Sequence, residues 1–505
     1  MLQLDGESLT LEQLEEIARA ATDVGLAASA SRRVAAARAV VDESASGDAA
    51  VYGVNTGFGA LAETAISRDQ LGALQLNLLR SHAAGVGEPL PVRAVRASMA
   101  LRANVLAKGF SGIRPQTLEL LLALLNRHVH PVVPSRGSVG ASGDLAPLAH
   151  LALVLVGEGL ATVNDSAPMS GSDALRRAGL EPITLSSKEG LALINGTQPS
   201  TAVAALASAA ADRLARAADI TAALSIDALR GSSVPFDPRI HAARPHPGQR
   251  DSAANILALL HGSSINKSHE HCGRVQDAYS LRCTAQVHGA ARDALRFVRG
   301  TLTTEANAAT DNPMVFGDSG EILSGGNFHG APIAIAADLM AIAVTQFATI
   351  SERRSDRLVN PALSGLAPFL TTASGLQSGY MIAQVTAAAL TSELKTLAHP
   401  ASVDTIPTSA NKEDHVSMSM GAALKAERAV TSVAYVLAVE ILCACQAIDL
   451  LAPLSTSPPL QRVHAFVRAI APTLTDDRPP APDIERIAAS LVDGSFENAC
   501  GVDVK

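Results

Sequence analysis

Two long stretches of the chain, residues 331–350 and 430–451, are apolar on nearly every side of the helix that each predicts. A helix that is apolar all round is stable only inside a large protein core or in a membrane. Each stretch also carries carboxylates, Asp338 in the first and Glu440 and Asp449 in the second, which argue against a bilayer span. We therefore expect both stretches to be helices buried in a bundle.

Most of the remaining sequence is also typical of helices. Residues 11–21 place leucines and an isoleucine at helical spacing behind Thr10 and Gln13, which match a capping box. Alanine dominates residues 201–224, where small side chains allow helices to pack closely over a long contact. Because strand-like alternation is scarce, we predict a mainly α fold built on a bundle of long helices.

Glycine-rich loops are concentrated in the first part of the chain. YGVNTGFG at 52–59 and GSVGASGD at 137–144 both precede the region dominated by long helices. We expect a loop-rich N-terminal domain over residues 1–200. Residues 201–505 are expected to form the long-helix bundle and a helical C-terminal region, with a soft boundary between the two parts.

Charge and cysteine content limit the class of partner. The net charge of −8, without a block of like charges, provides no basic surface for nucleic acid and no membrane contact. Five cysteines in 505 residues fit a reducing cytosol better than a disulfide framework. The N-terminal stretch has no basic segment followed by an apolar one, so it is not a signal peptide. We expect a cytoplasmic protein with a small-molecule partner.

Nucleotide, metal and acyl-transfer sites have little support. The loop at 52–59 lacks the Lys-Ser/Thr pair of a phosphate-binding loop, so no nucleotide is expected. The histidines of HVH at 128–130 and of SHEHC at 268–272 lack the spacing of zinc ligands, so no metal is expected. Cys283 lies in no local nucleophile motif.

The tripeptide Ala141-Ser142-Gly143 has a specific chemical possibility. Glycine lets a backbone nitrogen come unusually close to a preceding carbonyl, because it has no Cβ. Attack of the Gly143 nitrogen on the Ala141 carbonyl carbon, with loss of two waters that carry away the Ala141 carbonyl oxygen and the Ser142 hydroxyl, would give an imidazolone ring with an exocyclic methylene. On this stretch alone a helix start capped by Ser142 or Asp144 is favoured.

The complete set of motifs resembles one family along essentially the full chain, the aromatic amino acid ammonia-lyases. The matching motifs occur in the family's order: YGVNTGFG, GSVGASGDLAPLAH, NGTQ, QDAYSLRC, TDNPM, GGNFHG and EDHVSM. The resemblance implies the helical fold that this family shares with the fumarase–aspartase group. It also implies conversion of Ala141, Ser142 and Gly143 into 4-methylidene-imidazole-5-one (MIO), an electrophilic prosthetic group.

The same resemblance implies the base and the substrate anchor. Tyr52 would remove the β-proton, and its phenol, with an ordinary pKa near 10, needs a lowered pKa to do so. Arg282 would bind the substrate carboxylate through two parallel hydrogen bonds, which a lysine cannot reproduce.

Further positions would hold the substrate. By resemblance Asn195, Gln276 and Tyr279 position it and polarise the imidazolone carbonyl, and Phe328 encloses its ring. Glu413 would contact the substrate imidazole or move a proton at the amine. Lys412 stands where many relatives have Gln, which puts a cation beside the Glu413 carboxylate.

Ser81-His82 and Glu413 point to the substrate. By resemblance, phenylalanine lyases carry an apolar pair and tyrosine lyases a His-Leu pair at 81–82, whereas this pair resembles the branch that acts on L-histidine. A phenyl ring would leave both polar groups unpaired at a cost of about 1–3 kcal/mol each. The expected reaction is loss of ammonia from L-histidine to give trans-urocanate, the first step of histidine degradation.

Alternatives remain open at this level. Another aromatic amino acid, tyrosine or phenylalanine, could be the substrate. An aminomutase, which returns ammonia to the β-carbon, uses the same tripeptide, and an inactive helical scaffold is a third possibility. The electrophile could add to the amino group, which we favour, or to the imidazole ring. The resemblance further implies a homotetramer of dihedral symmetry with active sites shared between chains.

Overall fold

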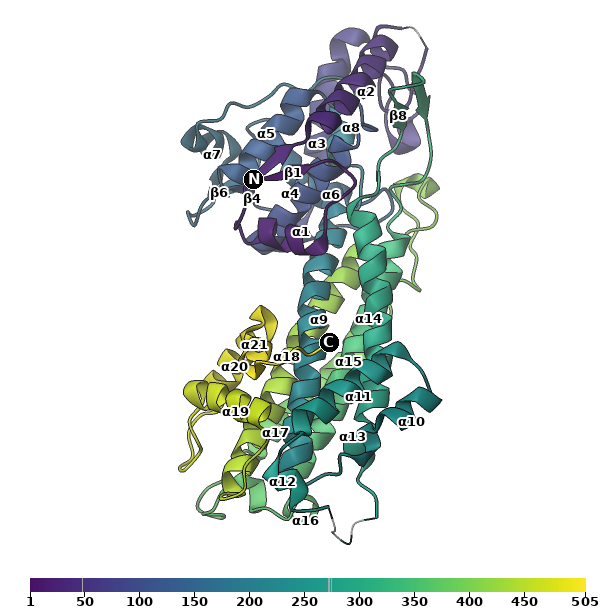
Figure 1. Ribbon diagram of the computed structural model, residues 1–505. Coiled ribbons are helices and arrows are strands. Elements are labelled where there is room, and N and C mark those ends of the chain that lie inside the picture. Colours follow the sequence, from purple (N-terminus) through teal and green to yellow (C-terminus); the bar gives the residue numbers. More distant parts are fainter. Residues whose placement is uncertain (48, 271–272, 274) are drawn as a thin grey trace. The chain divides into compact units, whose positions relative to one another are not determined.

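The computed structural model describes residues 1–505 except 48, 271–272 and 274 (Figure 1). The chain divides into two compact units, each assembled from separate segments. Unit 1 contains residues 1–206, 299–338 and 400–424, and unit 2 contains residues 207–298, 339–399 and 425–505. The expected division at residue 200 remains a prediction.

Unit 1 is built around short and medium-length helices. Its helices are α1 (Leu11–Ala18), α2 (Ala28–Ser46), α3 (Leu71–His82), α4 (Val92–Ala107), α5 (Pro115–Asn126), α6 (Leu145–Leu155), α7 (Gly171–Ala178) and α8 (Glu189–Ile194). Helix α4 packs against α1 and α5, and α3 packs against α6 and α8. The capping box predicted at Thr10 and Gln13 is confirmed at the start of α1.

Small β-ladders join the loops of unit 1. The strands are β1 (Leu2–Leu4), β2 (Val24–Leu26), β3 (Val86–Pro89), β4 (Val129–Pro131), β5 (Pro134–Arg136), β6 (Leu160–Val163), β7 (Met169–Ser170), β8 (Met314–Phe316) and β9 (Glu321–Leu323). β1 and β2 pair in parallel, with Leu2 opposite Val24. The pairs β3–β5 and β8–β9 and the order β4-β6-β7 are antiparallel. The β3–β5 ladder connects segments that are distant in sequence, whereas β8 and β9 form a hairpin.

Four long helices pass from one unit's residues into the other's. They are α9 (Gln198–Ala228), α14 (Thr284–Ala306), α15 (Ala331–Val359) and α18 (Ser419–Leu450). Unit 2 also contains α10 (Pro238–Ala243), α11 (Pro247–Leu260), α12 (Ser264–Lys267), α13 (Tyr279–Arg282), α16 (Pro361–Ser364), α17 (Met381–Leu397), α19 (Pro458–Ile470), α20 (Ala481–Asp493) and α21 (Ser495–Cys500). The predicted mainly α fold is confirmed.

Buried charges tie the long helices together within unit 2. Glu440 of α18 accepts hydrogen bonds from Ser225 of α9 at 2.6 Å and from Arg354 Nη2 of α15 at 2.9 Å. Asp219 of α9 similarly binds His288 and Arg292 of α14, at 2.7 and 2.6 Å. Because each buried carboxylate has charged or hydroxyl partners, these contacts also specify which helices are neighbours.

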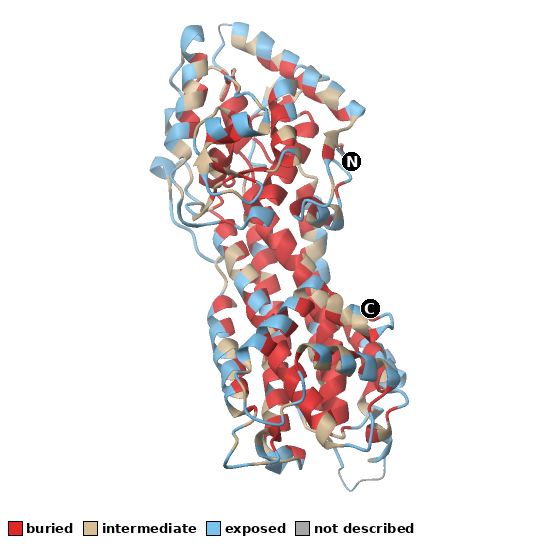
Figure 2. Ribbon diagram, turned by 90° about the vertical axis from the view of Figure 1, so that its left-hand side faces the viewer, coloured by how far each residue is buried: buried red, intermediate tan, exposed pale blue. Residues whose placement is uncertain are grey.

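Helices α15 and α18 are long and apolar enough for a membrane span by length and composition, but 72% and 83% of their most apolar stretches are buried inside the protein. Figure 2 shows buried residues along these long helices. Asp338 accepts a hydrogen bond from the Ser402 backbone at 2.7 Å, and Glu440 has the partners described above. The predicted burial of both stretches is confirmed.

Candidate active site

A cavity of about 380 Å³ in unit 1 gathers five of the residues predicted from the sequence. These five are Tyr52, His82, Ser142, Asn195 and Glu413. The remaining lining residues are Phe58, Gly59, Leu61, Leu78, Leu145, Leu191, Ser409 and Ala410. Polar side chains from widely separated segments therefore converge on an otherwise largely apolar pocket, as is typical of small-molecule sites.

The Ala141-Ser142-Gly143 tripeptide lies in a tightly folded loop. Gly143 has a φ of +72° and forms a parallel bridge with Gly196. A Cβ on Gly143 would lie 2.2 Å from the Gly196 carbonyl oxygen, a contact that no alanine could make. Both the backbone conformation and the close approach thus require glycine at position 143.

Asp144 occupies the N-cap position of α6 but does not cap it with its side chain. Its carboxylate instead accepts hydrogen bonds from Ser138 Oγ at 2.6 Å and from the Ser200 backbone at 2.8 Å. Burial raises the pKa of Asp144, while these hydrogen bonds lower it. The capping interpretation is wrong for this side chain, because Asp144 joins the loop to the start of α9.

Ser142 is held between Asn195 and Glu413. Ser142 Oγ donates to Glu413 Oε1 at 2.7 Å, and Asn195 Nδ2 donates to the Ser142 carbonyl oxygen at 2.9 Å. In the ring closure considered above, Ser142 Oγ is the atom lost as water and the Ser142 carbonyl becomes the ring carbonyl. The residues therefore fit MIO, because Asn195 already donates to the oxygen that would remain.

Tyr52 borders the same cavity, and the Gly59 backbone donates to its hydroxyl at 3.4 Å. Burial raises the pKa of Tyr52, the Glu413 charge raises it further, and the Gly59 hydrogen bond lowers it. A base requires a lowered pKa. Within the described residues of one chain, the Tyr52 pKa is instead raised, opposite to the expectation. The physical reason is that a buried phenol beside a carboxylate resists losing its proton.

His82, at the end of α3, lies in the pocket as a neutral imidazole. Burial lowers the pKa of His82, while its hydrogen bond with the Leu78 carbonyl and the Glu413 charge oppose this change. His82 Nδ1 lies 2.9 Å from the Leu78 carbonyl oxygen, which can only accept, so Nδ1 carries the hydrogen. His82 Nε2 is consequently the ring's acceptor atom.

Thr408 and the turn after it are site features that the sequence analysis missed. Thr408 Oγ1 donates to Glu413 Oε2 at 2.5 Å, so the described contacts occupy both oxygens of this carboxylate. Ser409 and Ala410 line the cavity with φ values of +51° and +52°. Neither residue is a glycine, so the sequence carries no signal for this turn.

The other predicted site residues are not part of this pocket. Phe328 is half-buried in unit 1 and is not among the residues that line the cavity. Gln276, Tyr279 and Arg282 belong to unit 2. Gln276 is exposed, Tyr279 is 70% exposed, and the Arg282 guanidinium lies 4.7 Å from the centre of the Tyr279 ring. Their functional roles remain predictions.

Lys412 and the histidine motifs can also be placed. Lys412 is exposed. Throughout the described parts of the chain, no group of three or more His, Cys, Asp or Glu side chains could hold a metal. Residues 271–272 of the SHEHC motif lie outside the described residues.

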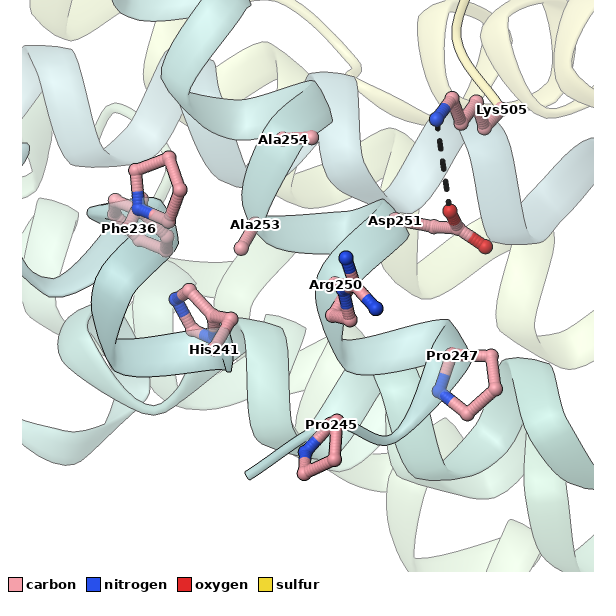
Figure 3. A pocket seen from close by; sticks show the side chains of 10 residues that line it. Phe236, His241, Pro245, Pro247, Arg250, Asp251, Ala253, Ala254 and Lys505 are labelled. Atoms are coloured by element: carbon pink, nitrogen blue, oxygen red, sulfur yellow. Dashed lines mark ion pairs between the residues drawn. The ribbon is translucent and has the colours of Figure 1, made fainter. Parts of the chain in front are cut away.

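A second cavity, of about 370 Å³, lies in unit 2 (Figure 3). Prolines form much of its wall together with His241 and Arg250, and Asp251 pairs with Lys505 at 3.9 Å. It contains none of the residues predicted from the sequence. The cavity in unit 1 is therefore the candidate active site.

Comparison with known proteins identifies the family of the chain. The aromatic amino acid lyase model matches residues 9–469. A histidine ammonia-lyase from Anaeromyxobacter dehalogenans (strain 2CP-C) is 57% identical over 504 residues, covering 98% of this chain and 99% of that protein.

Two solved structures give the same fold. Histidine ammonia-lyase from Trypanosoma cruzi is 46% identical, with a TM-score of 0.92 and coverage of 99% of this chain and 95% of that one. Tyrosine aminomutase from Streptomyces globisporus is 39% identical, with a TM-score of 0.94 and complete coverage of both chains, 100% and 100%. With its sequence motifs, its helical fold and its family match in agreement, this chain belongs to the aromatic amino acid lyase family.

Proposed function

We propose that this chain is a histidine ammonia-lyase, which converts L-histidine into trans-urocanate and ammonia. The observation that carries the proposal is that His82 and Glu413 both line the cavity that contains Ser142. An imidazole ring can hydrogen-bond both half-buried side chains, whereas phenyl would offer neither of them a partner, at about 1–3 kcal/mol each. The 57% identity to a histidine ammonia-lyase supports the same substrate.

The Ala141-Ser142-Gly143 tripeptide would form MIO, which supplies an electrophilic carbon at the position of the Ser142 side chain. Asn195 Nδ2 holds the carbonyl oxygen of Ser142, and this donor stabilises negative charge on that oxygen. Asn195 Oδ1 is buried without a partner in the described chain. It therefore offers an acceptor for the substrate's ammonium group.

Glu413 and His82 bind the substrate ring. Once the Ser142 hydroxyl has left as water, Glu413 Oε1 loses its donor and can accept an N–H from the substrate. His82 Nε2 is a second acceptor, because Nδ1 is bound to the Leu78 carbonyl. A substrate imidazole protonated on both nitrogens can donate to both acceptors.

Tyr52 would remove the β-proton and Arg282 would hold the carboxylate. Because burial and Glu413 raise the Tyr52 pKa, a cationic group brought near by the substrate or another chain must offset this rise. The substrate's ammonium group carries such a charge. Arg282 Nε is buried without a partner in the described chain, so this N–H is an unused donor that a carboxylate could accept.

We further propose a cytoplasmic homotetramer in which Gln276, Tyr279, Arg282 and Phe328 complete a site shared between chains. Large apolar side chains are exposed on two helices, Ile335 and Ile342 on α15 and Ile382 and Val385 on α17. Such surfaces favour subunit contacts. Loss of activity on dilution to monomers tests this part of the proposal.

Purified protein given L-histidine, L-tyrosine or L-phenylalanine in parallel tests the substrate assignment. We expect urocanate absorbance with L-histidine and little product from the other two. Mass spectrometry of the products also detects any β-amino acid, the outcome for an aminomutase; the 0.94 TM-score to a tyrosine aminomutase makes this comparison worthwhile. Cinnamate, coumarate or a β-amino acid as the main product would overturn the proposal.

A further inference from the structure

Arg102 is a fully buried arginine in the middle of α4. Its guanidinium donates from Nη1 to the Asn195 carbonyl at 2.9 Å and to Gln198 Oε1 at 2.8 Å, and from Nη2 to the Ala192 carbonyl. The first and third acceptors are carbonyls at the end of α8, where helix geometry leaves such groups without internal partners. One side chain therefore fastens the end of α8 to the beginning of α9.

The segment between these two helices contacts the ring-forming tripeptide. Asn195 Nδ2 donates to the Ser142 carbonyl at 2.9 Å, and the Gly196 carbonyl accepts the Asp144 backbone N–H at 2.7 Å. A Cβ on Gly196 would lie 2.4 Å from Arg102 Nη1, and one on Gly143 would lie 2.2 Å from the Gly196 oxygen. Arg102, Gly196 and Gly143 are thus layered without an intervening side chain.

Arg102 is buried near both a carboxylate and another cation. Burial lowers the pKa of Arg102 to about 10, and the nearby Asp311 carboxylate opposes that change, so the guanidinium stays charged at neutral pH. Asp311 also pairs with buried Lys188 at 3.3 Å. A lysine at position 102 would keep the charge but could not direct donors to three acceptors in one plane.

We propose that Arg102 is a positioning residue that holds Asn195 and Gly196 against the tripeptide, so that both ring formation and turnover depend on it. The part of this inference that concerns turnover rests on the proposed function. The part that concerns ring formation does not depend on which substrate the protein uses. Without the hydrogen bonds from the Arg102 guanidinium, Asn195 and Gly196 would shift relative to Ser142 and Gly143. A misplacement of about 1 Å in a catalytic geometry costs roughly 100-fold in rate.

Arg102→Lys is the test, with Arg96→Lys as the matched control. Arg96 is also a buried arginine of α4, but its guanidinium binds the carbonyls of Ile17 and Leu125, at 2.9 and 3.0 Å, and not α8. Intact mass measures the fraction of chains that have lost two waters, thermal unfolding measures stability, and steady-state kinetics separates kcat from KM for L-histidine.

We expect Arg102→Lys to fold, to contain fewer ring-bearing chains, and to lose about 100-fold in kcat with KM changed less than about threefold. Arg96→Lys should lose comparable stability but keep the wild-type mass and kcat. Wild-type mass and kcat in Arg102→Lys would overturn the proposal, as would equal loss of the ring in Arg96→Lys.

Gln198→Met covers the case in which Arg102→Lys does not fold. It removes one of the three acceptors of the Arg102 guanidinium, so we expect a smaller loss of ring-bearing chains than in Arg102→Lys. An unchanged mass would count against the proposal. If wild-type protein carries the ring but gives no urocanate, the substrate assignment fails while the mass comparison still decides the role of Arg102.

Discussion

The loop around Ser142 in unit 1 and the 275–282 segment in unit 2 carry the two halves of the predicted site in contrasting ways. Ser142, Asn195 and Glu413 are joined by direct hydrogen bonds. In the second region Gln276 is exposed and Tyr279 is 70% exposed. Within one chain, the residues that contact the tripeptide are thus already joined to it by hydrogen bonds. Arg282, the proposed substrate anchor, is half-buried and follows two exposed residues, Gln276 and Tyr279.

Variants in the two regions should therefore have different effects. Changes around Ser142 should alter ring formation or the chemical step, because those residues contact the tripeptide. Changes in the 275–282 segment should alter substrate binding and leave the mass of the chain unaffected. Measuring mass and kinetics on the same variants therefore separates the two regions.

The largest effect on the chemical step is expected for Tyr52→Phe. Loss of a general base typically costs about 10²–10⁴-fold, so kcat should fall by that amount. The two-water mass loss should be retained, since Tyr52 makes no described hydrogen bond to the tripeptide. Tyr435→Phe, which removes a hydroxyl bound to Glu485, is the control and should be fully active. A Tyr52→Phe enzyme with wild-type kcat would exclude the base role.

Arg282→Lys tests the second region. Replacing two parallel hydrogen bonds by one should raise KM for L-histidine by up to about 100-fold. Intact mass should still show the loss of two waters. Arg462→Lys, which alters an arginine bound to the Cys500 carbonyl elsewhere in unit 2, should leave KM unchanged. Loss of the ring in Arg282→Lys would contradict the proposal that the 275–282 segment acts only in substrate binding.

His82→Leu should change specificity more than overall rate. Removing the imidazole leaves a substrate imidazole without one acceptor, so kcat/KM for L-histidine should fall about tenfold or more relative to L-tyrosine. Ser81→Ala is the neighbouring control, because Ser81 does not line the cavity. An unchanged ratio of the two kcat/KM values would show that His82 does not read the substrate ring.

The smallest effect is a change in tyrosine ionisation. The Glu413 charge contributes to the raised pKa of Tyr52, so Glu413→Gln should move ionisation of Tyr52 to lower pH. The chain has four tyrosines and no tryptophan, which makes an ultraviolet titration practical. The difference between each protein and its Tyr52→Phe counterpart isolates the Tyr52 signal. A shift to higher pH would contradict the assigned electrostatics.

Local patterns predicted several parts of the molecule well. The capping box at Thr10 and the burial of α15 and α18 follow from residue spacing and hydropathy, and both are confirmed. The glycine-rich loop indicated a tight turn at Gly143, because glycine adopts a positive φ without strain.

Tertiary contacts explain what local patterns could not predict. Arg102 stands in a helix whose sequence does not distinguish a buried arginine from a surface one, and its partners lie about 90 residues away. The pKa direction of Tyr52 depends on burial and on Glu413, which is distant in sequence. Asp144 could be predicted as a helix cap, but its carboxylate binds Ser138 and Ser200 instead.

Intact mass of the purified wild-type chain beside Ser142→Ala tests the central claim most directly. Ring formation removes the Ala141 carbonyl oxygen and the Ser142 hydroxyl as water, so the wild type should be lighter than its sequence by two water molecules. Ser142→Ala lacks the hydroxyl, should show its full calculated mass, and should not turn over L-histidine. An active wild-type chain of full calculated mass would contradict the claim that this protein makes its own electrophile.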